Sequence, residues 1–200
     1  YSLSLKISPA VLIPRPETEL LVDRALAFIH DKPDALVLDL GTGSGAIALA
    51  IASQAPQCRV LATDINPTGL DFARENAARH GLDNVSFLLS NWYEQLSDLR
   101  FDLIISNPPY IDPTDPHLER GDVRFEPRQA LAATERGLAD IKQIVSGAPD
   151  HLNPGGLLAL EHGYDQGEAT RDLMTNTGLI NAHTEQDLNR LDRISSACLN

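Results

Sequence analysis

The chain has 200 residues, of which 42% are hydrophobic and 22% are charged, as expected for one globular domain with a substantial core. Its net charge of −12 argues against broad contact with a nucleic-acid backbone, which needs patches of Lys and Arg, so direct nucleic-acid binding is not expected. No apolar run approaches the roughly 18 residues of a membrane span, and Cys58 and Cys198 form no disulfide framework, so we expect a cytoplasmic protein without membrane contact.

The N-terminal stretch combines a weak strand pattern with a proline-rich segment that leads into a helix. Apolar and polar residues alternate over residues 3–7, which predicts an edge strand. Pro14 and Pro16 hold the next segment extended, and an apolar stripe then predicts a helix that ends near His30. Thr18 is a candidate cap for this helix, and Pro16 in its first turn is the alternative start.

A predicted strand, a glycine-rich turn and a helix follow one another over residues 35–52. The turn reads Asp39-Leu40-Gly41-Thr42-Gly43-Ser44-Gly45, in which glycines let the backbone approach a ligand and aim N–H groups at it. Gly41-x-Gly43-x-x-Ala46 also fits a dinucleotide fingerprint, so the glycines alone leave two cofactor classes open. Asp39 favours a cationic ligand with ammonium and sulfonium groups over a pyrophosphate, and the alternative is a simple turn or capping acid.

The next two predicted strands end in residues that suit the rest of a nucleoside. Residues 59–63 lead to Asp64, which lies about 20 residues after the glycines and is placed to accept hydrogen bonds from a ribose diol. Residues 85–89 lead to Ser90-Asn91-Trp92-Tyr93, where a polar side chain and aromatic rings would meet an adenine. For the two aromatic residues, ordinary core packing is the alternative.

The fourth predicted strand, residues 101–106, ends in Asn107-Pro108-Pro109-Tyr110. Such a strand delivers Asn107 to the carboxyl edge of a parallel sheet, one strand along from the glycine turn. Pro109 restricts Pro108 to an extended backbone, so the Pro108 carbonyl and the Asn107 side-chain oxygen form two fixed acceptors for a planar NH2 group. Tyr110 offers a flat face beside them. The motif predicts a holder for an amide or exocyclic amine, and a plain Pro-Pro turn with a surface Tyr is the alternative.

The remaining elements complete an alternation of helices and strands. They are a helix over 66–80, a loop over 111–129, a helix over 130–152 interrupted near Gly137 and Gly147, a strand over 157–161, a helix over 164–177 and an antiparallel strand pair within 179–199. The long loop is a candidate lid or substrate contact, and its His117 is a candidate general base or an ordinary surface residue. Glu161 and His162 end the strand over 157–161; a site role is the lesser alternative for them, and no metal site is visible.

These motifs together resemble a known family. The Asp39–Gly45 turn and the Asn107–Tyr110 tetrad resemble those of S-adenosylmethionine-dependent, Rossmann-like methyltransferases that modify amide or exocyclic amine nitrogens. Ile13-Pro14-Arg15-Pro16-Glu17-Thr18-Glu19 and Gly121-Asp122-Val123-Arg124-Phe125-Glu126-Pro127 look like stretches of the bacterial peptide-chain release factor glutamine N5-methyltransferases. The residues from Pro16 to Glu19 favour this branch over the related enzymes that modify a ribosomal protein. The resemblance covers nearly the whole chain.

The resemblance implies a fold, a reaction and a partner. The fold would be α/β of the class I methyltransferase type: a mostly parallel seven-stranded sheet with helices on both faces and an antiparallel C-terminal strand pair, in one domain over residues 1–200. The reaction would use S-adenosylmethionine, release S-adenosylhomocysteine and methylate a glutamine of a release factor. The family also has an N-terminal helical domain that nothing here matches, and the chain begins at Tyr1, so we expect a fragment.

Carried over by position, the resemblance also implies roles for individual residues. The catalytic residues would be Asn107, Pro108 and Tyr110. The cofactor-binding residues would be Asp39, Gly41, Thr42, Gly43, Asp64, Ile65, Asn91, Trp92 and Asn107. The substrate-binding residues would be Asn107, Pro108, Pro109, Tyr110, Arg15, Glu17 and Glu126. Asn91 stands where the family usually has an acid near the adenine amine, and by spacing alone Glu17 would be a first-turn acid favoured by the helix dipole.

Two other functions stay open at this point. An N6-adenine DNA or RNA methyltransferase would use the same tetrad, because an exocyclic adenine amine presents the same planar NH2 group. The charge of −12 and the Pro16–Glu19 residues argue against it, and a salt-dependent affinity for oligonucleotides would support it. A non-catalytic module that binds the cofactor or a protein is the third function, and cofactor binding without methyl transfer would support that one.

Overall fold

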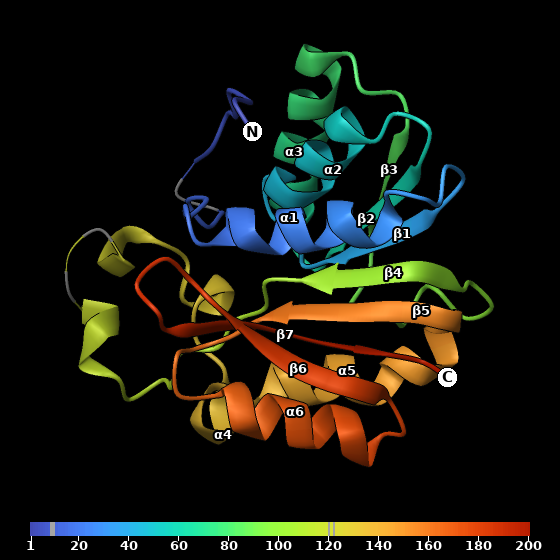
Figure 1. Cartoon of the computed structure of the whole chain (residues 1–200). Coiled ribbons are helices and arrows are strands. Elements are labelled where there is room, and N and C mark those ends of the chain that lie inside the picture. The colour runs from blue at the N-terminus through green and yellow to red at the C-terminus, as the bar shows by residue number, and fades with distance from the viewer. Residues whose placement is uncertain (9–10, 120, 122) are drawn as a thin grey trace.

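The computed structural model describes residues 1–8, 11–119, 121 and 123–200 of the chain (Figure 1). Its strands form one seven-stranded sheet in the order β3-β2-β1-β4-β5-β7-β6. The strands are β1 Leu36–Leu40, β2 Arg59–Asp64, β3 Val85–Leu89, β4 Phe101–Ser106, β5 Leu152–Glu161, β6 Ile180–Gln186 and β7 Asp192–Cys198. The first five pair in parallel, whereas β7 is antiparallel to both β5 and β6. The predicted mostly parallel sheet with an antiparallel C-terminal pair is therefore confirmed.

Helices cover both faces of this sheet (Figure 1). On one face lie α1 Thr18–Ile29, α2 Ala46–Gln54 and α3 Pro67–His80, and on the other lie α5 Ala139–His151 and α6 Gly167–Asn176. The connection between β4 and α5 contains the short turns η1 Pro116–Glu119, η2 Val123–Phe125 and η3 Arg128–Ala130, and the four-residue element α4 Thr134–Gly137. None of the helices in the described part of the chain has the length and apolar character that a membrane crossing requires.

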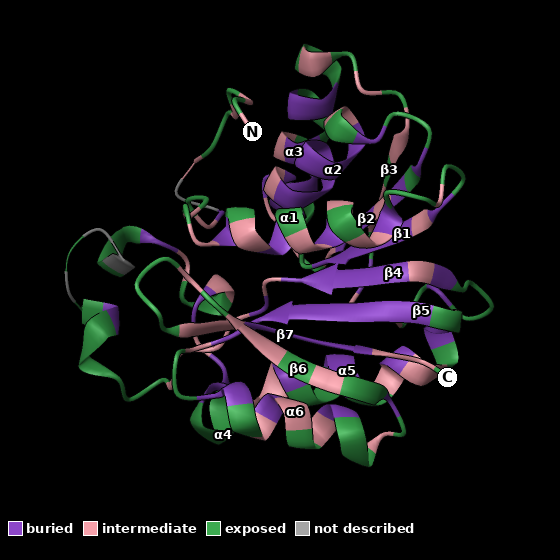
Figure 2. Cartoon of the chain, viewed as in Figure 1, coloured by how far each residue is buried: buried purple, intermediate pink, exposed green. Residues whose placement is uncertain are grey.

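Alternate residues of the central strands feed two separate hydrophobic cores. In β4, Ile105 packs with α1 and α2, whereas its neighbour Ile104 packs with α5 and α6. This follows from the strand period of two, which turns successive side chains to opposite faces. Figure 2 shows β4 and the second half of β5 largely buried, and in both segments the sequence reads as an apolar run.

The strand register brings the functional turns to one edge of the sheet. Leu40, the last residue of β1, lies opposite Thr63 of β2 and Ser106 of β4, and Ser106 lies opposite Leu160 of β5. The carboxyl ends of these four strands therefore meet at one edge, and the strand order reverses between β1 and β4. Ligands of open α/β sheets bind in the crevice that such a reversal creates.

The N-terminal edge strand predicted over residues 3–7 is wrong. This segment has no regular structure and lies against α3 instead of pairing with the sheet. The Lys6 backbone N–H donates to Asn76 Oδ1 over 2.7 Å, and Asn76 Nδ2 donates back to the Lys6 carbonyl over 3.0 Å. One buried asparagine thus satisfies the backbone groups that a neighbouring strand would otherwise bind.

Two helix starts and one strand start were also predicted wrongly. The helix predicted over 130–152 begins at Ala139, because the chain before it takes left-handed backbone angles that no helix tolerates. Gly137 does interrupt this segment as predicted, but Gly147 lies inside α5, where the ring of Tyr93 fills the space beside it. The helix predicted from residue 164 begins at Gly167, and β5 begins at Leu152, five residues earlier than expected.

Candidate active site

Two cavities open at the carboxyl edge of the sheet, and Asn107 lines both of them. The turn cavity has a volume of about 570 Å³ and is lined by Gly41, Gly43, Asp64, Trp92 and Asn107, among others. The tyrosine cavity has a volume of about 900 Å³ and is lined by Asn107, Tyr110 and Glu161, among others. Both volumes suit small-molecule or side-chain binding. A group held in one cavity can therefore meet a group held in the other at Asn107.

The glycine turn presents backbone to the turn cavity. Gly41 and Gly43 have φ angles of +72° and +57°, in the left-handed region that favours glycine. The N–H groups of Gly41 and Thr42 donate to the Thr63 carbonyl, each over 2.9 Å, which fastens the turn to β2. A Cβ atom added at Gly43 would meet no other atom within 4 Å, so the backbone there borders open space. The turn thus leaves room for a ligand beside Gly43, and the close backbone approach that the glycine pattern predicts stays a prediction.

The side chain of Asp39 is buried behind the glycine turn and does not line the turn cavity. Its side chain is fully buried, and one carboxylate oxygen accepts hydrogen bonds from the Thr42 hydroxyl (2.6 Å) and the Ala48 N–H (3.2 Å). The other oxygen has no hydrogen-bond partner within the described residues. Burial raises the pKa of Asp39 to about 7. Neither Asp39 nor Thr42 is among the residues that line the two cavities, so their predicted contact with a cofactor is not seen here.

Asp64 stands at the end of β2 and lines the turn cavity, as predicted for a residue that meets a ribose. It accepts hydrogen bonds from the N–H of Gly43 (2.7 Å) and of Asn66 (2.8 Å). Burial raises the pKa of the Asp64 carboxyl. Each carboxylate oxygen has more than one acceptor site, so Asp64 can bind the turn and a diol together. Ile65 follows it and exposes its side chain at the rim of the cavity.

The residues after β3 divide between the cavity and the core. Asn91 and Trp92 line the turn cavity, and the Trp92 ring lies against Gly41. Asn91 Nδ2 donates to Glu94 Oε1 over 2.8 Å, which leaves the Asn91 side-chain oxygen as an acceptor. Tyr93 follows the alternative of core packing: its hydroxyl donates to the Ile144 carbonyl over 2.9 Å.

The turn cavity also contains an acidic residue that was not predicted from the sequence. Asp140, in the first turn of α5, lines the cavity and accepts a hydrogen bond from the Trp92 side chain. Burial raises the pKa of this carboxyl. No motif surrounds Asp140, and its distance along the chain from the glycine turn leaves no local signal of its position.

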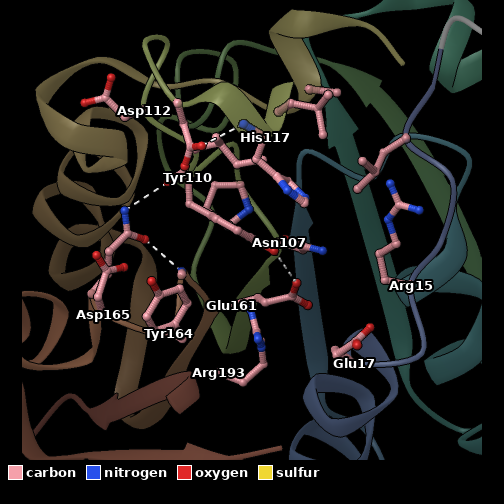
Figure 3. Close-up of a pocket in the computed structure, with 18 of the residues that line it drawn as sticks. Arg15, Glu17, Asn107, Tyr110, Asp112, His117, Glu161, Tyr164, Asp165 and Arg193 are labelled. Atoms are coloured by element: carbon pink, nitrogen blue, oxygen red, sulfur yellow. Dashed lines mark hydrogen bonds between the residues drawn. The ribbon is translucent and has the colours of Figure 1, made fainter. Parts of the chain in front are cut away.

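The tetrad that follows β4 divides its residues between the two cavities. Pro108 and Tyr110 line the tyrosine cavity, Pro109 lines the turn cavity, and Asn107 lines both. Asn107 Nδ2 donates to the Thr18 hydroxyl oxygen over 3.2 Å. No described residue donates to the Asn107 Oδ1 or to the Pro108 carbonyl oxygen, so both acceptors predicted from the motif are open. Figure 3 shows Asn107 and Tyr110 together on one wall of the cavity.

Glu161 is the main functional residue for which sequence reasoning made a site role the lesser alternative. It ends β5, where the register of the sheet places it beside the residue that follows β4, and it is 1% exposed. Its carboxylate accepts hydrogen bonds from Thr18 (2.8 Å) and from the Tyr110 hydroxyl (3.1 Å). Burial raises the pKa of Glu161, although these hydrogen bonds and the Arg193 charge oppose the rise. The available signal was the adjacency of β4 and β5, since their ends must meet.

Thr18 does not cap α1 as predicted. Glu17 occupies the N-cap position without a side-chain hydrogen bond, and the Thr18 hydroxyl points to Glu161 instead. A capping threonine accepts a hydrogen bond from a backbone N–H through its side-chain oxygen, but Thr18 already lies inside α1, and its oxygen accepts from Asn107 Nδ2 instead.

The proline-rich segment and the long loop form the opposite side of the tyrosine cavity. Arg15 and Glu17 line it, together with His117 of the loop (Figure 3). Glu126 lines neither cavity: it is buried, pairs with Arg15 and accepts a hydrogen bond from the Ile13 N–H over 3.1 Å. Its position is that of a support for the Arg15 segment. Asp122 of the Gly121–Pro127 stretch lies outside the described residues.

Comparison with known proteins gives the same family that the motifs suggest. Residues 31–196 match a family described as a methyltransferase domain. A release factor glutamine methyltransferase of Xylella fastidiosa (strain Temecula1) is 53% identical over 195 residues, which cover 98% of this chain and 71% of that protein. The protein of the same name in Escherichia coli (strain K12) is 47% identical, with coverage of 98% and 70%.

Solved structures agree with this assignment. The release factor-specific protein-(glutamine-N5) methyltransferase of Alicyclobacillus acidocaldarius has a TM-score of 0.59 and 26% identity, over 98% of this chain and 99% of that one. A methyltransferase of Pyrococcus furiosus has a TM-score of 0.71 at 20% identity, over 99% and 89% of the two chains, which supports the class I methyltransferase fold alone. Because identity near 50% extends over almost the whole sequence, the chain belongs to the release factor glutamine methyltransferase family.

Proposed function

We propose that this chain transfers a methyl group from S-adenosylmethionine to the side-chain amide nitrogen of a glutamine in a peptide-chain release factor. The observation that carries this function is the position of Asn107, which lines both cavities with an open acceptor oxygen. The family membership supports the same cofactor, reaction and protein partner. When bound, S-adenosylmethionine supplies an electrophilic methyl group on a sulfonium.

The residues of the turn cavity fit this cofactor. The backbone at Gly43 borders open space, as a ligand in close contact with the turn requires, and Gly41 lines the same cavity beside the Trp92 ring. Asp64 would accept hydrogen bonds from the ribose hydroxyls, and Trp92 offers an aromatic face for the adenine. Asn91 would accept from the adenine amine through its side-chain oxygen, which its bond to Glu94 leaves open.

The tyrosine cavity would orient the glutamine amide. An amide nitrogen is a poor nucleophile, because its lone pair is delocalised into the carbonyl group. Asn107 Oδ1 and the Pro108 carbonyl would each accept one of its N–H groups, which adds electron density to the nitrogen and directs it toward the turn cavity. Tyr110 would pack on the amide plane. Catalysis then rests on position and electrostatics.

This arrangement does not require a strong general base. The amide nitrogen becomes acidic as it is alkylated, so its proton can leave to water. His117 lines the tyrosine cavity, but its ring is exposed and forms no hydrogen bond with Asn107 or Tyr110 in the described part of the chain. Proton removal therefore needs no dedicated residue in this mechanism.

The partner would enter through the tyrosine cavity. Its volume of about 900 Å³ exceeds the space that one glutamine side chain needs, so residues beside the glutamine would also enter. Arg15 and Glu17 would contact them from the proline-rich side, and Glu126 would hold that side in place through Arg15. We place the reaction in the cytoplasm, in agreement with two cysteines that are both free.

A methyl-transfer assay tests this function. Labelled S-adenosylmethionine is offered with a release factor and, in parallel, with an adenine-containing oligonucleotide, and the products are analysed by mass spectrometry. Label on a release-factor glutamine is the expected result. Label on the oligonucleotide alone would overturn the protein substrate, and cofactor binding without transfer to either would favour a binding module.

A further inference from the structure

Four polar side chains form one continuous chain of hydrogen bonds beside the cavities. Asn107 donates to Thr18 over 3.2 Å, Thr18 donates to Glu161 over 2.8 Å, and Tyr110 donates to Glu161 over 3.1 Å. Thr18 and Glu161 are 8% and 1% exposed, so water does not compete for these bonds. Three separate segments supply them: the start of α1, the end of β5 and the turn after β4.

The Glu161 carboxylate determines which group donates in each hydrogen bond among these four side chains. The Arg193 charge and the hydrogen bonds from Thr18 and Tyr110 favour the ionised form of Glu161. In that form the carboxylate only accepts hydrogen bonds, so the single hydroxyl proton of Thr18 must point to Glu161. The Thr18 oxygen can then only accept, and the Asn107 group that faces it must be the NH2. The Asn107 oxygen is thereby turned away from Thr18, toward the junction of the two cavities.

We propose that Glu161 is a positioning residue for methyl transfer: through Thr18 it turns the acceptor oxygen of Asn107 toward the substrate amide, and directly it holds the ring of Tyr110. This inference rests on the proposed function, because it concerns the two residues that would receive the glutamine amide. An asparagine amide is nearly symmetric in shape, so packing alone does not distinguish its oxygen from its nitrogen. The wrong orientation would present an NH2 group to the substrate NH2 group, and both are donors.

Two substitutions disturb, in different ways, the hydrogen bonds that orient the Asn107 amide. In Glu161→Gln the side chain keeps its shape but gains an NH2 group, which can donate to Thr18 and so allow the hydroxyl to donate to Asn107 Oδ1. In Thr18→Val the shape is again kept, while the link between Glu161 and Asn107 is lost. Thr18→Ser retains the hydroxyl and serves as the conservative rescue. Glu168→Gln makes the same chemical change as Glu161→Gln at an exposed glutamate of α6 and serves as its control.

The experiment compares kcat, KM for release factor and the Kd for S-adenosylmethionine across these variants. We expect Glu161→Gln and Thr18→Val to lower kcat by up to about a hundredfold, the cost of a misplaced reacting group. The cofactor Kd should stay unchanged, because neither side chain lines the turn cavity. Thr18→Ser and Glu168→Gln should retain the wild-type kcat. A wild-type kcat in Thr18→Val, or equal losses in Thr18→Val and Thr18→Ser, would overturn the inference even if Glu161→Gln does not fold.

A second measurement does not depend on methyl transfer. The side-chain NH2 signals of Asn107 are observed by NMR in protein labelled with ¹⁵N-asparagine and are assigned by their absence in Asn107→Ala. Loss of the Thr18 bond should shift them in Thr18→Val and leave them in place in Thr18→Ser. Unshifted signals in Thr18→Val would overturn the inference. A wild-type protein without transfer to release factor would instead contradict the proposed function, and the NMR comparison would still decide the orientation of Asn107.

Discussion

The side-chain nitrogen of Asn107 donates to the hydroxyl oxygen of Thr18 over 3.2 Å, although 89 positions separate the two residues in the chain. This bond occupies one end of the Asn107 amide and leaves its oxygen open at the junction of the two cavities. The tetrad after β4 therefore depends on α1, a helix far away in the sequence, for the orientation of its first residue.

Removal of the Asn107 side chain should lower turnover without loss of cofactor binding. Asn107→Ala is expected to reduce kcat by roughly 10²- to 10³-fold, by analogy with loss of one oriented hydrogen-bonding group at a reacting centre. The Kd for S-adenosylmethionine, measured by calorimetry, should hardly change. Asn189→Ala, at an exposed asparagine, is the control. An unchanged kcat in Asn107→Ala would contradict the role that we assign to its oxygen.

Substitution of Asp64 should weaken the binding of S-adenosylmethionine and leave the rate of methyl transfer to the amide unchanged. Asp64→Ala removes a carboxylate that lines the turn cavity, and hydrogen bonds to charged groups contribute about 1.5–3 kcal/mol, so the Kd for S-adenosylmethionine should rise about tenfold to a hundredfold. At saturating cofactor, kcat should stay near the wild-type value. Asp83→Ala, at an exposed acid, is the control. If Asp64→Ala lowered kcat and left the Kd unchanged, the ribose contact would be wrong.

Asp39 should make the stability of the protein depend on pH. Burial raises its pKa from 3.8 to about 7, so between these values the folded chain keeps a proton that the unfolded chain has lost. Stability therefore falls as pH rises through this window, and above it the group costs at most about 4 kcal/mol, since one pKa unit corresponds to about 1.4 kcal/mol. Asp39→Asn should remove this slope.

Urea unfolding at a series of pH values between 4 and 8 measures this effect. The free energy of unfolding of the wild type, minus that of Asp39→Asn, should decrease with rising pH. Asp83→Asn should follow the wild type across the same range. A difference that is constant with pH, or that increases, would show that Asp39 is ionised in the folded protein over this window.

Gly137 should be more sensitive to substitution than another glycine with a similar backbone. Its φ is +81°, and a Cβ atom there would overlap the carbonyl oxygen of Tyr110 and lie 2.6 Å from Gln166 Nε2. Gly81 has a φ of +62° with open space beside it, so Gly81→Ala should cost only the left-handed strain of about 1–2 kcal/mol. Gly137→Ala should cost more and also lower kcat, because Tyr110 must move.

Urea unfolding and steady-state kinetics on both alanine variants provide the comparison. Equal losses of stability, with kcat unchanged in Gly137→Ala, would mean that the Tyr110 backbone can move without effect on the site. A selective loss of kcat in Gly137→Ala would instead show that the position of Tyr110 controls turnover.

Local patterns in the sequence were sufficient to predict most of the strands and helices and two parts of the site. Apolar runs predicted β1 to β4 within one residue, and in β1 and β4 the run follows from burial on both faces of the sheet. The glycine turn and the Asn107–Tyr110 tetrad are contiguous in the chain, so their chemistry can be read from neighbouring residues. Parallel strand order then places them side by side.

Only the tertiary structure shows which individual residues outside these two motifs contact them or the cavities beside them. Glu161 and Asp140 carry no surrounding pattern, and Thr18 reads as a helix cap until β5 places a buried carboxylate beside it. Asp39 and Glu126 were predicted as ligand contacts; the structure shows Asp39 bonded to Thr42 and Glu126 paired with Arg15, and their contact with a bound ligand stays a prediction. Periodicity reports what a residue does for its own helix or strand, whereas Glu161 and Thr18 contact each other across 143 positions of the chain. Their contact is set by the register of the sheet and the packing of α1 upon it.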